Sequence, residues 1–104
     1  MSESRGRVTV AQNVLDTIVQ LTALSVPGVS RMGTRSGSRH GTRVQVHDQQ
    51  VVVDVHVIVA PDANMREVGR AIQIEVARAV RDMVGMEVAA VDVHIQDVEA
   101  AARS

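Results

Sequence analysis

Hydrophobic and polar positions change their period several times along this chain of 104 residues, and each change marks a predicted element. Strict alternation with valine at every second position predicts half-buried strands at Arg7–Val10, Arg43–His47 and Val51–Ala60. Val88–Val98 alternates in the same way, and Val29–Met32 is a further short candidate. The longest run places the valines at 51, 53, 55, 57 and 59 on one face of its strand.

The segment Ala11–Ser25 has the period of an amphipathic helix instead. Thr9 and Gln12 have the spacing of a capping box at its start, and Pro27-Gly28 stops it. The apolar stripe expected to face the core consists of Val14, Leu15, Ile18, Leu21 and Thr22.

Asn64–Val84 shows the stronger helical period. Asn64 and Glu67 predict a capping box at its start, and Gly85 stands where a left-handed C-cap belongs. The stripe expected to face the core consists of Met65, Val68, Ile72, Val76, Ala79 or Val80, and Met83.

These elements predict an α+β fold with the order β-α-β-β-α-β, in which two helices pack on one face of a small mixed sheet. The first strand is expected at a sheet edge, and a split ferredoxin-like order is the alternative. We expect one domain over residues 7–98, with a flexible Gly- and Arg-rich loop at 33–42. Residues 1–6 are expected to be a disordered N-terminus and residues 99–104 a C-terminal tail.

The composition excludes several kinds of chemistry, because the chain has no Cys, Lys, Phe, Tyr or Trp. Without Cys there is neither thiol catalysis nor a zinc knuckle, and without Lys there is neither a P-loop nor a Schiff base. Without aromatic rings there is no platform on which nucleic-acid bases stack. No nucleophile motif or dinucleotide fingerprint is present either, so we expect no enzyme activity and no cofactor.

Charge and hydropathy favour a cytoplasmic protein. The net charge is −1, from 11 basic and 12 acidic residues, which gives no general attraction to nucleic acid or acidic lipid. No apolar run approaches the roughly 18 residues of a membrane span.

Three predicted strands share a short sequence pattern, in which a polar residue and a histidine lie two positions apart on one face. The histidines are His47, His56 and His94, and the last two follow Asp54 and Asp92. A solvated face or a protein contact is the favoured interpretation, with Asp54, His56, Asp92 and His94 as candidate contact residues. A metal site built from His47, His56 and His94 is the alternative, because imidazole and carboxylate are common metal ligands.

A second candidate lies in the loop. Arg31, Arg35, Arg39 and Arg43 recur every four residues, and no acidic residue lies between Asp16 and Asp48. The favoured interpretation is a solubilising loop. Anion or nucleic-acid binding is the alternative, because arginine guanidinium groups in a loop of Gly and Ser can hold phosphate. Nucleic acid is not the expected partner, because four arginines without aromatic residues make a poor nucleic-acid surface.

Four stretches together resemble the alkaline shock protein family, a group of small general-stress proteins best known from Gram-positive bacteria. They are RVTVAQNVLDTI (7–18), VPGVSRM (26–32), VVVDVHVIV (51–59), and the run from Val68 to Val98, with its M-x-G followed by a V-x-V-x-I-x-D-V strand. The chain departs from the family pattern at Ala60-Pro61-Asp62, where an aromatic–glycine pair is common.

The resemblance implies a non-enzymatic protein of cell-envelope homeostasis and stress. It implies self-association, and binding to a small membrane-anchored partner at the inner surface of the membrane. It supplies no catalytic residues. We therefore expect an interaction protein whose contact surface is the sheet face or the valine-rich edge strand.

Overall fold

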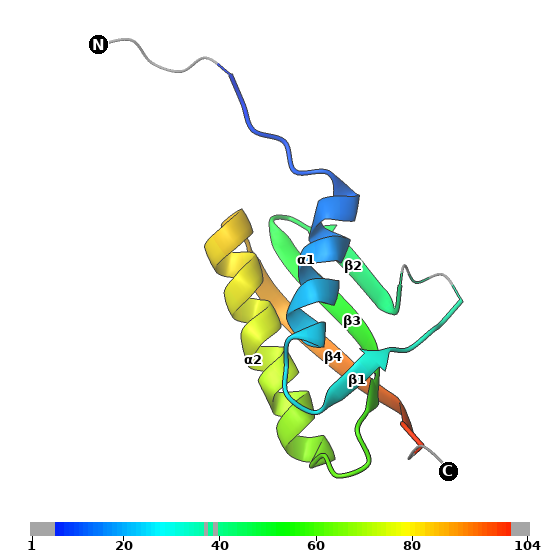
Figure 1. Ribbon diagram of the computed structural model, residues 1–104. Helices are drawn as coiled ribbons and strands as arrows, with labels where there is room; N and C mark the ends of the chain where they lie inside the picture. Colours follow the sequence, from blue (N-terminus) through cyan, green and yellow to red (C-terminus); the bar gives the residue numbers. More distant parts are fainter. Residues whose placement is uncertain (1–5, 37, 39, 101–104) are drawn as a thin grey trace.

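The computed structural model describes residues 6–36, 38 and 40–100 (Figure 1). In this part of the chain, two helices and four strands follow one another in the order α-β-β-β-α-β. They are α1 (Gln12–Leu24), β1 (Val29–Met32), β2 (Thr42–His47), β3 (Gln50–Val59), α2 (Met65–Val84) and β4 (Glu87–Val98).

Strand β3 is the centre of the sheet. β4 pairs with it in parallel along one side, and β2 and β1 pair with it antiparallel along the other. β2 lies against the first part of β3 and β1 against its last part, so the two short strands share one edge. The predicted α+β class with a mixed sheet is confirmed.

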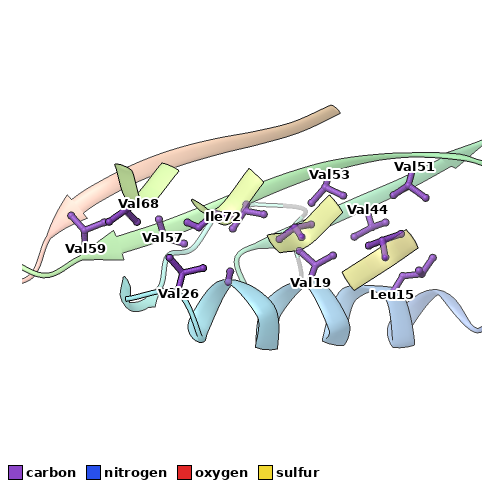
Figure 2. Packing of buried hydrophobic residues seen from close by; sticks show 14 residues of the cluster. Leu15, Val19, Val26, Val44, Val51, Val53, Val57, Val59, Val68 and Ile72 are labelled. Atoms are coloured by element: carbon purple, nitrogen blue, oxygen red, sulfur yellow. The ribbon is translucent and has the colours of Figure 1, made fainter. Parts of the chain in front are cut away.

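Both helices cover the same face of this sheet (Figure 1). Since alternate side chains of a strand point to opposite faces, the valines at 51, 53, 55, 57 and 59 of β3 all face the helices, and none of them is exposed. Figure 2 shows Leu15, Val19 and Val26 meeting these valines from below the sheet. Aliphatic side chains thus fill the core without any aromatic ring.

The predicted strand at Arg7–Val10 is wrong for the single chain. These residues form neither strand nor helix, and among the described residues nothing pairs with them. The split ferredoxin-like order, which needs that strand, is therefore not formed. The predicted Thr9–Gln12 capping box is also wrong, because α1 has Ala11 at its N-cap and no side-chain cap bond. Gln12 instead donates from Nε2 to the Val44 carbonyl oxygen at 2.9 Å.

The buried stripe of α1 differs from the predicted one. Leu15, Val19 and Ala23 are buried, whereas Val14 and Leu21 are 44% and 61% exposed. The helix carries two apolar stripes at helical spacing, and periodicity alone does not say which one faces the sheet.

The prediction for α2 is accurate in its centre. Its buried residues are Val68, Ile72, Val76 and Val80, while Met65 and Met83 at the two ends are exposed. Asn64 Oδ1 accepts a hydrogen bond from the Glu67 backbone N–H at 3.1 Å, and Gly85 adopts the predicted left-handed conformation with φ of 79°.

Candidate interaction surface

The face of the sheet opposite the helices carries the residues singled out in the sequence. The parallel register of β3 and β4 sets Asp54 beside Asp92 and His56 beside His94. The two aspartates thus lie side by side on neighbouring strands, and so do the two histidines, as the repeated sequence pattern indicated. Asp92 and His94 are exposed, Asp54 is half-buried and His56 is buried.

Asp54, His56 and His94 form a small cluster on this face. The imidazole of His94 contacts Asp54 through Nε2 and Oδ1 at 3.3 Å, which is an ion pair when His94 is protonated. The rings of His56 and His94 have centroids 4.4 Å apart at an angle of 37°. The carboxylate of Asp54 thus holds the exposed imidazole, while the buried imidazole lies against the ring of its neighbour.

His56 is buried although no helix covers its face, and close to it the Gln96 side chain of β4 reaches the chain after β1. Gln96 is the extra residue of a bulge, since Val57 pairs with Ile95 and Ile58 with Asp97. Its amide accepts from Thr34 N–H at 2.9 Å and donates to the Thr34 carbonyl oxygen at 2.6 Å. The Gln96–Thr34 bridge joins β4 to the chain after β1.

The backbone of His56 joins the ends of the two short strands. Gly33 N–H donates to the His56 carbonyl oxygen at 2.7 Å, and His56 N–H donates to the Gly41 carbonyl oxygen at 2.8 Å. A Cβ at Gly41 would lie 2.6 Å from the Gly33 carbonyl oxygen, and its φ is 79°. Only glycine satisfies both demands here, so the loop closes directly against His56.

The surroundings of His56 favour its neutral form. Burial lowers the pKa of His56 most, the neighbouring His94 and Arg35 lower it further, and Asp54 raises it. Within the described part of the chain, Nδ1 of this ring is buried without a hydrogen-bond partner.

His47, the third predicted metal ligand, does not reach this cluster. It pairs with Gln50, six residues before His56 on β3, which places it roughly 20 Å away at about 3.3 Å per residue. Among residues 6–36, 38 and 40–100, no group of three or more His, Asp or Glu side chains is placed to hold a metal ion.

The arginines of the predicted anion-binding loop have separate surroundings. Arg31 Nε donates to Glu99 Oε1 at 3.0 Å. The hydrogen bonds from Ser30 and Arg31 lower the pKa of Glu99. Arg35 acts electrostatically on His56, and Arg43 lies opposite Asp54 in the sheet register. Arg39 lies outside the described residues.

One long edge of the sheet is open. β4 has 12 residues and, among the described strands, pairs only with β3. Its helix-facing residues are half-buried against α2, and its other side chains are exposed. Sequence reasoning identified this strand and its polar face but missed Gln96 and Thr34, because no local pattern marks the bulge. The glycines that flank the loop were the available signal.

The described residues contain no helix with the length and hydropathy needed to cross a bilayer. The fold is similar to solved structures of variants of the MamM CTD. A histidine-to-alanine variant has a TM-score of 0.67 at 18% identity, covering 86% of this chain and 100% of that one. The zinc form of an aspartate-to-asparagine variant has a TM-score of 0.65 at 17% identity, covering 88% and 91%. At this identity the likeness shows a shared fold alone.

None of the curated proteins matches the chain. A family model, however, matches residues 1–100, which is nearly the whole sequence, and it describes the alkaline shock protein 23 family with a cell envelope-related function. This confirms the resemblance carried by the strand and helix motifs. The chain belongs to the alkaline shock protein 23 family, whose function is related to the cell envelope.

Proposed function

We propose that this protein is a non-enzymatic interaction domain of the cell envelope, which associates with itself and binds a membrane-anchored partner at the inner surface of the membrane. The open edge of β4 is the observation that carries the proposal. A strand edge has regularly spaced N–H and C=O groups, and a second chain satisfies them by adding a strand.

The side chains around this edge suit a protein contact. Asp92 and His94 stand exposed beside it, and Asp54 holds the imidazole of His94 at 3.3 Å. The imidazole held by Asp54 and the exposed carboxylate of Asp92 give a partner directional polar contacts, while the half-buried valines of β4 supply apolar area at the same edge. The contact surface of the proposal is therefore the β4 edge with Asp54, Asp92 and His94.

His56 has an indirect role in this proposal. Because it is 6% exposed, a partner cannot contact much of it. Its ring packs against the exposed ring of His94, with the two centroids 4.4 Å apart.

The membrane-anchored partner is proposed on the family alone, and a pull-down from native membranes and cytosol tests it. The intact chain is compared with Asp92→Arg, which reverses a charge on the proposed surface, and with Asp82→Arg, which makes the same change on the exposed side of α2. We expect the intact chain and Asp82→Arg to retain one membrane protein that Asp92→Arg loses. Equal retention by all three proteins would rule out the proposed contact surface. Retention of no membrane protein would rule out the proposed membrane-anchored partner.

A further inference from the structure

The segment Arg7–Val10 has the pattern of a strand but no partner in its own chain. Arg7 and Thr9 alternate with Val8 and Val10, and Val8 is 93% exposed while Val10 is 41% exposed. Figure 1 shows this segment leading away from the body of the molecule before α1 begins. None of its backbone groups makes a hydrogen bond within the described residues. Its β-forming sequence is thus left unused in the single chain.

The outer edge of β2 is a poor place for such a segment. Gln12 Nε2 already donates to the Val44 carbonyl oxygen, which fastens the start of α1 to β2. β2 also carries Arg43 and His47. A strand that brings a further arginine would meet like charge there. β1 has four residues and a register shift, which leaves little regular edge.

The outer edge of β4 fits the segment better. Gln73 Nε2 donates to the Val91 carbonyl oxygen at 3.1 Å, and Val98 N–H donates to Asp97 Oδ1 at 2.8 Å. Between these two contacts, residues 92–95 pair with β3 alone among the described strands, and Gln96 is the bulge residue that follows them. That stretch is long enough for a four-residue strand.

Charge also favours β4. It carries Glu87, Asp92 and Asp97 and has no arginine, whereas the segment contributes Arg7 and no acid. Opposite charges on neighbouring strands stabilise a pairing that like charges oppose.

We propose that Arg7–Val10 of one copy of this chain adds as a strand to the outer edge of β4 in a second copy. The inference rests on the proposed self-association and names the segment that makes it. The added strand gives the backbone of residues 7–10 its hydrogen bonds and covers Val8 with the partner's strand. A reciprocal exchange closes a dimer, and a one-way exchange extends a chain of copies.

A proline scan tests the pairing directly. Thr9→Pro removes a backbone donor and stiffens the segment, so it opposes strand addition, yet that N–H has no partner within the described fold. Gly6→Pro is the matched control, because it makes the same change just outside the segment and a side chain there meets nothing within 4 Å. Sedimentation velocity over a concentration series measures association of the full-length chains, and thermal unfolding at low concentration checks the fold.

We expect Thr9→Pro to weaken association by roughly tenfold or more and to leave the unfolding temperature of the dilute protein unchanged, while Gly6→Pro behaves as wild type. If wild type associates and Thr9→Pro associates equally well, the segment is not the contact and the inference fails while the proposed function stands. If wild type stays monomeric throughout, the proposed self-association itself has failed.

A cysteine pair checks which edge is used, because the natural chain has no cysteine. Val8→Cys is mixed with Val93→Cys on β4, or with Gln45→Cys on β2 as the control, under mild oxidation. Mass analysis counts the mixed disulfides. A mixed disulfide formed preferentially with Val93→Cys supports the proposal, and preference for Gln45→Cys overturns the assignment to β4.

Discussion

Among single residues, His56 has the most unusual surroundings. An imidazole on the face of the sheet away from the helices is ordinarily solvated, but His56 is only 6% exposed, and the closing glycines of the loop lie against its backbone. Burial lowers the pKa of His56 most, and the nearby His94 and Arg35 lower it further. The neutral form of the imidazole is therefore favoured in the folded protein.

This arrangement predicts how the stability of the protein depends on pH. The unfolded chain protonates His56 near its ordinary pKa of about 6.5, whereas the folded protein protonates it at a lower pH. The unfolded state therefore binds more protons below about pH 6.5, and the free energy of unfolding falls as the pH falls through that value towards the folded pKa. Above the unfolded pKa this contribution is constant.

His56→Gln should flatten the fall in stability between about pH 7 and about pH 5, because glutamine does not titrate. Urea unfolding followed by far-ultraviolet circular dichroism measures it, since the chain has no aromatic residue to report by fluorescence. His47→Gln, a change on the exposed hairpin, is the control and should keep the slope. An unchanged slope in His56→Gln would assign the pH dependence to other groups.

Among the elements, the two helices differ in how well their ends and faces could be predicted. α2 has one dominant apolar stripe, a side-chain cap at Asn64 and a left-handed glycine at its end, and the sequence predicted all three features. In α1, the Val14–Leu21 stripe competes with the Leu15–Val19–Ala23 stripe, and packing against α2 and the sheet decides between them. Local sequence does not contain that tertiary information.

The caps supply a prediction for each helix. Asn64→Ala removes the hydrogen bond to Glu67 N–H and should destabilise the protein by about 1 kcal/mol. Ala11→Ser should stabilise it by about 0.5–1 kcal/mol, because Ala11 has extended N-cap geometry with φ of −70° and ψ of 151° but no side-chain acceptor. Urea unfolding of both variants beside wild type measures the changes. A stabilised Asn64→Ala, or a destabilised Ala11→Ser, would contradict the cap assignments.

The sheet shows the same division between local and tertiary information. Valine alternation identified β3 and β4 and which residues share a face. The pairing of His56 with His94, and the separation of His47 from both, depends on strand order and register, which the sequence pattern left open. The Gln96–Thr34 bridge spans 62 positions of the chain and has no local signal at all.

For the whole molecule, the strand predicted at Arg7–Val10 and not found in the single chain bears on the proposed function. Arg7–Val10 has the pattern of a strand but pairs with no strand among the described residues, and the outer edge of β4 has no partner strand there either. Two complementary features left unpaired in one copy are what self-association would join. This reasoning, together with membership in a family of cell envelope-related function, supports an interaction domain.

The molar mass of the intact protein as a function of concentration tests this account most directly. Sedimentation velocity with interference optics suits a chain that lacks rings and absorbs little at 280 nm. We expect the mass to rise with concentration from that of the 11.2 kDa monomer to that of a dimer or a larger assembly. A mass that stays at 11.2 kDa from low to high micromolar concentration would contradict it.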